Sequence, residues 1–366
     1  MKSINGYYAA LVAATVFLLM TLISCGTKQS AGGEEDEIYV VADSIEYSRL
    51  QASLLQVFSK IILTPQPEKL FKLKRKNFSE LEDVKSKKNV IVVAPINSGS
   101  EVSEFITTIL DSADLAKVKT GNKFYFTKYD LWVREQLVMV LSATSLEMLN
   151  EKLLGKHEDL PYYFQNISNK RLSQSLYEPE YEKIDIQAEL LDRYGWIIYV
   201  QKDFILDEEQ PADNFVLLRK STGDDMESRI FVHWIDNCTP DYLNKDSVWN
   251  ERNRITNKYF RNSTGSAFAE IADDYKTASE VNFNGRYAIM MQGLWRMSDK
   301  SMGGPFVNYT FFDEITHRVY MIDGSVYAPK YFKKKLIQQL DVLLQSFMTK
   351  EELSKERREE LMDELK

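Results

Sequence analysis

The segment from Gln292 to Phe306 is the part of the sequence best suited to bind a ligand. Trp295 and Arg296 are predicted to end a strand, where the indole could act as a platform and the guanidinium could donate to an anion. We expect a tight bend after them, because glycine permits positive φ and proline fixes the exit of the chain. The residues expected in this bend are Met302, Gly303, Gly304, Pro305 and Phe306. The alternative is a hairpin corner whose glycines permit close packing beneath an aromatic side chain.

Histidine and cysteine give little indication of metal or nucleophilic chemistry. His157, His233 and His317 lie in separate segments, without the i,i+4 spacing of a zinc-binding helix. Cys238 closely follows His233, which leaves two interpretations open: a nucleophilic thiol, or a small apolar side chain at the end of a strand. The sequence also lacks phosphate-binding, dinucleotide-binding and Gly-x-Ser-x-Gly motifs. We therefore predict no metal and no cofactor, and favour a protein without enzymatic activity.

Cys25 has the surroundings of a lipid-modified cysteine. Lys2 precedes a segment from Tyr7 to Ser24 that contains no charge, which is typical of a secretory signal. The segment ends in Leu22-Ile23-Ser24-Cys25-Gly26, which resembles the bacterial lipoprotein signal, with an aliphatic residue at −3, a small residue at −1 and cysteine at +1. In that signal the thiol receives a diacylglyceryl group, and a peptidase cuts before the cysteine. The alternative is an uncleaved membrane anchor with an incidental cysteine.

The acylated chain is expected to begin with a flexible tether. We assign residues 1–24 to a signal peptide and residues 25–37 to the tether, because this segment is polar, rich in glycine and without apolar periodicity. Two or more fatty chains hold a protein stably at a bilayer, so a membrane is the first predicted partner. Gly26-Thr27 places no aspartate after the cysteine, which favours the outer membrane and leaves the membrane face open.

Composition and charge exclude several classes of protein. The chain has 366 residues, of which 44% are hydrophobic and 27% charged, and this excludes collagen, a disordered protein and a disulfide scaffold. Its net charge is −8 and no long basic stripe is present, so we predict no nucleic-acid partner. The pairs Asp224-Asp225 and Asp273-Asp274 are expected to be solvated loop charge.

The apolar patterns predict an α+β fold with antiparallel sheets backed by helices. The continuous β-branched run Asn89–Pro95 predicts a central buried strand. Asp213–Lys220 and Glu227–Asp236 alternate and predict a hairpin. A meander is expected from Tyr287–Arg296, Val307–Asp313 and His317–Asp323. The helices are too few and the hairpins too many for a doubly wound sheet.

The order of the predicted elements indicates two halves and a tail. Residues 38–176 and residues 177–348 each run from strands and a helix into further strands and a closing helix. Similar halves are one possibility, although no repeated residues support it. Residues 349–366 form a charged helical tail with a thin leucine stripe, which is either a solvated helix or one that docks a partner.

Three Asp-Ser-aliphatic triplets resemble the acceptor used for periplasmic O-glycosylation in Bacteroidota. Their serines are Ser44, Ser112 and Ser247. Each serine also suits a helix N-cap or a turn, and Ser247 is predicted to cap a helix from Ser247 to Tyr259. We expect at most one of them to be modified.

Several short motifs together resemble the Bacteroidota lipoprotein family of the domain of unknown function 4837. In order they are Glu37-Ile-Tyr-Val-Val-Ala-Asp43, Leu63-Thr-Pro-Gln-Pro-Glu68, Asn89-Val-Ile-Val-Val93, Gly293-Leu-Trp295, Met302-Gly-Gly-Pro-Phe306 and Val326-Tyr-Ala-Pro-Lys330. The resemblance extends over Glu37–Phe347. Arg252, Lys258 and Tyr259 resemble the family's Arg…Lys-Tyr segment, with Asn253 where an acid is expected. The resemblance implies an outer-membrane lipoprotein and supplies no catalytic residues, and Arg252 and Lys258 join the candidate binding residues.

Three hypotheses of function follow. The first is a lipid-anchored cell-envelope protein with a binding or structural accessory role toward an envelope protein or glycan. The second is an envelope hydrolase that acts on glycan or peptide through two carboxylates near the Trp295–Phe306 bend. The third is an assembly or motility accessory that docks through the C-terminal helix.

Overall fold

The computed structural model describes residues 28–62, 64–156, 159–223 and 225–366. The predicted signal peptide, Cys25, His157 and Asp224 lie outside the described residues. The chain divides into two compact units, of which unit 1 comprises the chain up to Leu54 and Leu73–Lys156, and unit 2 comprises Leu55–Lys72 and the chain from residue 157 onward.

The boundary between the units differs from the predicted one after residue 176. The helix that ends there belongs to unit 2. Its Phe164 packs edge-on against Phe58 and Phe71 of the unit 2 segment Leu55–Lys72, with ring centroids 5.8 and 5.9 Å apart. A contact between segments this far apart in the sequence leaves no local pattern from which it could be predicted.

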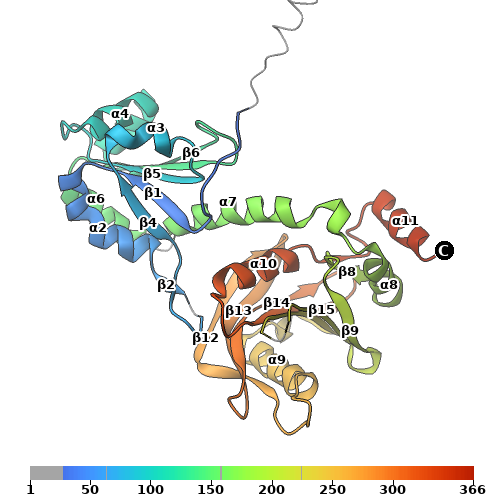
Figure 1. Ribbon diagram of the computed structural model, residues 1–366. Coiled ribbons are helices and arrows are strands. Elements are labelled where there is room, and N and C mark those ends of the chain that lie inside the picture. Colours follow the sequence, from blue (N-terminus) through green and yellow to red (C-terminus); the bar gives the residue numbers. More distant parts are fainter. Residues whose placement is uncertain (1–27, 63, 157–158, 224) are drawn as a thin grey trace, which may run out of the picture. The chain divides into compact units, whose positions relative to one another are not determined.

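Within the described residues, unit 1 contains a five-stranded mixed sheet with helices on both faces. Its strands are β1 (Glu37–Val41), β4 (Lys72–Lys76), β5 (Asn89–Val93), β6 (Tyr125–Tyr129) and β7 (Leu137–Leu141). Its helices are α2 (Ser44–Phe58), whose last turn from Leu55 belongs to unit 2, and α3 (Leu81–Val84), α4 (Glu101–Ile109), α5 (Ser112–Lys119) and α6 (Leu146–Gly155). A 3-10 turn lies at Phe78–Glu80. Figure 1 shows α3 and α4 on one face of the sheet, and α2 and α6 on the other.

The strand β5 is central in unit 1, as its β-branched run predicts. The strand order is β4-β1-β5-β7-β6, and every residue of β5 is buried. The strands β1 and β7 run parallel to β5, whereas β6 runs antiparallel to β7. The sheet of unit 1 is therefore mixed rather than antiparallel, as these strand pairs show.

The predicted tether is ordered over its second part. The backbone of Ala31 donates to the carbonyl of Arg134 at 2.9 Å, and that of Gly32 donates to the carbonyl of Ser86 at 2.8 Å. Lys88 in turn donates to the carbonyl of Gly32 at 2.9 Å. The prediction of a flexible segment up to residue 37 is therefore wrong for these residues. Small side chains let this segment lie closely along unit 1, and hydrogen bonds to a preformed surface replace the missing apolar periodicity.

In the part of the chain that the structure describes, unit 2 contains a seven-stranded antiparallel sheet in the order β12-β13-β14-β15-β11-β10-β9. These strands are β9 (Ile205–Gln210), β10 (Phe215–Ser221), β11 (Glu227–Ile235), β12 (Ala269–Phe283), β13 (Arg286–Met297), β14 (Gly303–Asp313) and β15 (Arg318–Tyr327). The helices are α7 (Asp159–Leu176), α8 (Ile184–Tyr194), α9 (Lys245–Tyr259), α10 (Lys334–Leu344) and α11 (Lys355–Glu364). Two small pairs are β2 (Ile61–Ile62) with β3 (Glu68–Lys69), and β8 (Trp196–Ile197) with β16 (Met348–Thr349). Single 3-10 turns lie at Pro179–Tyr181, Pro211–Asp213 and Pro240–Tyr242.

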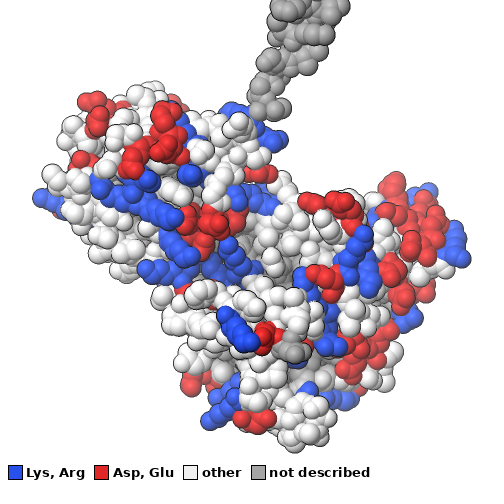
Figure 2. All heavy atoms as spheres, in the orientation of Figure 1, with Lys and Arg blue, Asp and Glu red and all other residues white. Residues whose placement is uncertain are grey.

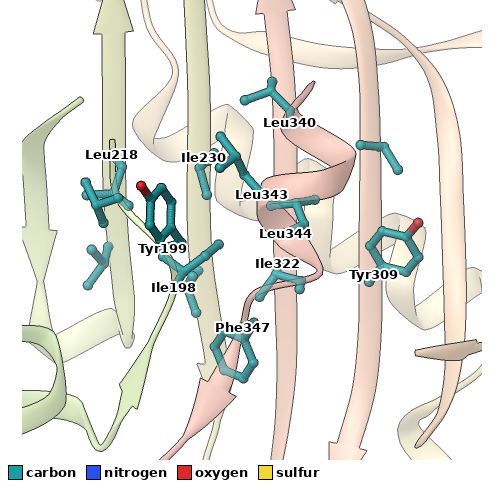
Figure 3. Packing of buried hydrophobic residues seen from close by; sticks show 14 of the residues in the cluster. Ile198, Tyr199, Leu218, Ile230, Tyr309, Ile322, Leu340, Leu343, Leu344 and Phe347 are labelled. Carbon is teal, nitrogen blue, oxygen red and sulfur yellow. The ribbon is translucent and has the colours of Figure 1, made fainter. Parts of the chain in front are cut away.

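Both faces of the seven-stranded sheet are buried. One face packs against α10, whose Leu340, Leu343 and Leu344 lie over the strands beside Phe347 (Figure 3). The other face packs against α9 through Val248 and Ile255. Because successive side chains of a strand point to opposite faces, a sheet that is covered twice needs strands that are almost continuously apolar.

The prediction of an α+β fold is confirmed. The hairpin of β10 and β11 and the meander of β13, β14 and β15 occur where the alternating patterns place them. The two halves have different sheets, since one is mixed and the other antiparallel. No helix among the described residues is long and apolar enough to cross a membrane.

The C-terminal tail is docked within unit 2. Residues Met348 and Thr349 pair with β8, and α11 packs against α8. Leu353 and Leu361 are buried in a small cluster with Leu191, whereas Leu365 is 42% exposed. Leu353 and Leu361 of the predicted leucine stripe are therefore buried within unit 2, and Leu365 is not.

We predict that Leu361→Ala lowers the free energy of unfolding by about 2–4 kcal/mol, because it removes a fully buried side chain and leaves a cavity. The matched control, Leu365→Ala, should change it by less than about 0.5 kcal/mol. Urea unfolding followed by circular dichroism measures both, and equal effects of the two variants would show that the tail does not pack as described.

Candidate functional site

The tight bend predicted at Met302–Phe306 lies earlier in the chain. Residues from Gly303 onward belong to β14, and the chain reverses at the preceding residues, where Lys300 has a φ of 61°. The Asp299 carboxylate accepts hydrogen bonds from the Ser301 amide at 3.0 Å and the Ser301 hydroxyl at 2.6 Å. The prediction of a bend at the glycines is wrong, because this aspartate-centred turn reverses the chain before they are reached.

Gly303 and Gly304 serve close packing between strands. A Cβ atom on Gly304 would lie 1.8 Å from the carbonyl oxygen of Val326, and one on Gly303 would lie 2.8 Å from that of Trp295. The Trp295 indole donates to the same Val326 oxygen at 3.2 Å. Three segments that the sequence presents as separate motifs thus meet at one corner of the sheet.

The two candidate ligand-binding residues of this corner point to different environments. Trp295 is 3% exposed and packs in the core beneath α9, together with Phe306. Arg296, its neighbour in the strand, is exposed and forms an ion pair with Glu270 at 2.9 Å. Met302 is half-buried against the same core, and Pro305 is buried. The indole face is therefore covered by protein side chains.

The carboxylates beside this corner form ion pairs or hydrogen bonds with neighbouring side chains. Glu270 holds Arg296, and the hydrogen bonds that Ser301 donates lower the pKa of Asp299. The hydrolase hypothesis requires two carboxyl groups, one of which has a raised pKa so that it can donate a proton to the leaving group. A lowered pKa in an exposed turn does not suit Asp299 to that role.

Arg252 lies in a buried polar cluster between α9 and the sheet. Its Nε donates to Oδ2 of Asp323 at 2.6 Å and its Nη2 donates to Oδ1 at 3.2 Å, with both side chains at most 1% exposed. Asn308 donates to the same carboxylate at 3.0 Å and accepts from Thr310 at 2.9 Å. The guanidinium also lies 3.5 Å from the centre of the Phe306 ring. This arrangement joins α9 to β14 and β15.

A second polar group continues along α9. The two ring nitrogens of His233 face the carbonyl oxygen of Asn214 at 2.9 Å and the Glu251 carboxylate at 2.8 Å. Arg254 donates to that carboxylate at 2.6 and 3.0 Å. Burial raises the pKa of the Glu251 carboxyl, but the hydrogen bonds and charges of His233 and Arg254 outweigh burial and hold the pKa at about 2. His233 thus connects the loop before β10 to α9 through its two ring nitrogens.

The remaining candidate residues lie apart from this cluster. Lys258 pairs with Asp213 at 2.5 Å, and Tyr259 donates to the same carboxylate. Asn253, which stands where an acid is expected, accepts a hydrogen bond from the Ile271 amide at 3.0 Å. Lys258 and Asn253 thus tie α9 to residues outside the helix.

Cys238 is half-buried in the loop that follows β11, rather than in the core. His233 has its ring nitrogens engaged elsewhere, and His317 is exposed at a turn with a φ of 52°. Among the described residues, no three His, Cys, Asp or Glu side chains form a group that could hold a metal ion.

The three serines of the Asp-Ser-aliphatic triplets lie at helix starts without acting as caps. Asp111 caps the helix that begins at Ser112, and its carboxylate accepts from the Asp114 amide at 2.7 Å. Asn244 caps α9 by accepting from the Ser247 amide at 2.9 Å, so the predicted cap at Ser247 is wrong. Ser44 is the exposed first residue of α2.

A polar cleft of about 510 Å³, which sequence reasoning missed, opens on unit 2. It lies where α8 ends, where β15 begins and beside the loop after β11. Its charged lining residues are Asp192, Arg193, Asp236, Arg318, Lys350 and Glu351. Arg318 pairs with Asp236 at 2.7 Å and donates to the Tyr194 carbonyl at 2.9 Å. The cleft therefore presents both signs of charge on a framework that is held by hydrogen bonds.

Comparison with known families separates the chain into two parts. The family model described as domain of unknown function (DUF4837) matches residues 182–346. These residues belong to the DUF4837 domain family. The model of another domain of unknown function (DUF8532) matches residues 31–177. The motifs between Glu37 and Val93 thus fall within the second match, and the DUF4837 match is narrower than the predicted Glu37–Phe347.

Other comparisons add no functional information. A comparison with curated proteins gives no match. Among solved structures, a point mutant of Protein Mog1 is 13% identical with a TM-score of 0.29, covering 42% of this chain and 90% of that one. The Saccharomyces cerevisiae Ran-binding protein Mog1p is 13% identical with a TM-score of 0.28, covering 43% and 90%. At these TM-scores the likeness supports no conclusion about fold or function.

We predict that Asp323→Asn lowers the free energy of unfolding by about 3–5 kcal/mol, because the Arg252 charge then lies buried without a carboxylate. Replacing both partners, with Arg252→Met and Asp323→Leu, should recover part of this loss, with a deficit of about 1–3 kcal/mol left because the buried Asn308 amide loses its acceptor. Urea unfolding followed by tryptophan fluorescence measures the difference. A double variant as unstable as the single one would refute the inference that the unpaired Arg252 charge causes the loss.

Glu251 should make stability depend on pH in the acid range. Its folded-state pKa of about 2 lies below the ordinary value of 4.5, so its contribution is complete above pH 4.5 and is lost as the pH falls toward 2. At about 1.4 kcal/mol per pKa unit, this contribution is about 3 kcal/mol. We expect Glu251→Gln to be less stable than the unmodified protein at neutral pH, with a difference that shrinks on acidification. Chemical unfolding over this pH range tests the sign, and a constant difference would contradict it.

Proposed function

We propose that the chain is a lipid-anchored protein of the cell envelope, in the outer membrane, with a binding or structural accessory role. The observation that carries this proposal is the segment Leu22–Gly26, in which Cys25 directly follows an uncharged apolar run. An acyl chain contributes about 0.8 kcal/mol for each buried CH₂ group, so two or more chains hold a folded body at a bilayer.

The described structure supports binding more than catalysis. The buried charges of Arg252, Asp323 and Glu251 are used to hold α9 on the sheet, and the indole of Trp295 is covered. The polar cleft beside Arg318 is open to solvent, and its lining offers hydrogen-bond donors and acceptors as well as positive and negative side chains. We infer that this cleft is where an envelope protein or a glycan contacts unit 2.

Acyl labelling tests the anchor. Cells that produce the full chain are grown with an alkyne-tagged fatty acid, and we expect the label on the unmodified protein and its loss in Cys25→Ser. Cys238→Ser is the matched control and should keep the label, because Cys238 is the cysteine of the folded body. Protease treatment of intact cells in the same experiment determines the membrane face. An unlabelled protein, or a label that persists in Cys25→Ser, would overturn the proposal.

A further inference from the structure

We propose that unit 2 carries a surface that rests on an anionic lipid bilayer. This basic–aromatic surface consists of Lys60, Ile61, Lys69, Lys330, Tyr331, Phe332 and Lys335. The inference rests on the proposed function, because a lipid anchor would keep this surface within reach of headgroups. It goes beyond that function by naming the lipid-contacting residues of the folded body.

The aromatic side chains of this surface are unusually exposed. Phe332 is 72% exposed and its neighbour Tyr331 is 51% exposed, while Ile61 is 59% exposed. Single exposed apolar residues are common on soluble proteins, but consecutive aromatic residues flanked by lysines are typical of segments that lie in a membrane interface. The order Lys330-Tyr331-Phe332 places both kinds of side chain in one short loop before α10.

Hydrogen bonds hold this loop against the β2–β3 hairpin, although the two segments are far apart in the sequence. The Glu68 carboxylate accepts from the backbone amides of Lys333 at 2.8 Å and of Lys334 at 3.2 Å. Gln66 donates to the Pro329 carbonyl at 3.2 Å and accepts from the Lys333 ammonium at 2.8 Å. Glu68 thereby supplies the acceptor that the start of α10 requires. A loop fixed in this way can present Phe332 without collapsing onto the protein.

The distribution of charged side chains would orient unit 2 at an anionic bilayer. The lysines Lys60, Lys69, Lys330 and Lys335 are exposed there. Glu68 holds the start of α10. Asp225 pairs with Lys330 at 2.5 Å, so this pair adds no net charge to the surface. On the face shown in Figure 2, acidic side chains of unit 2 gather instead over β9 and α11. An anionic bilayer would attract the lysines and repel the acidic region, which orients unit 2 with Phe332 toward the lipid.

The short extent of the basic surface favours lipid over nucleic acid as the occupant. A nucleic-acid site needs a longer basic track than this short surface provides. A bilayer needs only a few lysines when aromatic side chains and an anchor contribute as well.

Local amide exchange in the full-length protein tests the proposal. Vesicles of phosphatidylethanolamine and phosphatidylglycerol should slow exchange in residues 328–335 by about tenfold, whereas vesicles of phosphatidylcholine alone should not. High salt should reduce the protection, because it screens the lysines. The double variant Tyr331→Ser with Phe332→Ser should abolish the protection. The matched controls Tyr287→Ser and Ile315→Ser, at sites 52% and 63% exposed, should retain it.

Unchanged exchange at this loop with anionic vesicles overturns the inference, whether or not Cys25 is acylated. Protection by a single-stranded oligonucleotide but not by vesicles also overturns it and assigns the surface to nucleic acid. Protection that persists in Cys25→Ser supports the lipid surface while the labelling experiment decides the anchor separately.

Discussion

The ion pair of Arg252 and Asp323 is the interaction on which the architecture of unit 2 depends. Moving two charges out of water costs several kcal/mol for each ion, so the pair is tolerable only with good geometry and further hydrogen bonds. The structure supplies both, since the guanidinium makes two bonds to the carboxylate and Asn308 adds a third. Because a charge buried without its partner is so unfavourable, α9 is restricted to the position on the sheet in which the pair forms.

Close approach of backbones provides the second constraint. Gly304 leaves room for the Val326 carbonyl, and the Trp295 indole donates to that same oxygen. A residue set that looks suited to ligand binding in the sequence is therefore used to close the corner of the sheet. Where large aromatic residues stand beside glycines, packing and binding need the same residue types, and only burial distinguishes the two.

Because the buried ion pair and the glycine corner are used for packing, unit 2 can contact other molecules only through its surface. The polar cleft beside Arg318 and the basic–aromatic surface around Phe332 lie on loops and helix ends that the sheet holds in place. The proposed lipid anchor by itself would allow the folded body many orientations at the bilayer. A second, weaker contact with the headgroups would select one of them and leave the cleft available to a partner.

The sequence by itself determined the local elements of this protein. The β-branched run of β5, the hairpin of β10 and β11 and the meander of β13, β14 and β15 follow from apolar periods that each strand carries within itself. It also pointed to the DUF4837 family. The tertiary structure decided which residues meet. Arg252 forms an ion pair with Asp323, which lies 71 residues away in the sequence, and the Glu68 carboxylate accepts from amides at the start of α10. The side chain of Trp295 is buried, whereas that of its neighbour Arg296 is exposed. Such pairings depend on strand register and on which helix covers which face, and these follow from the burial of the whole chain rather than from any local pattern.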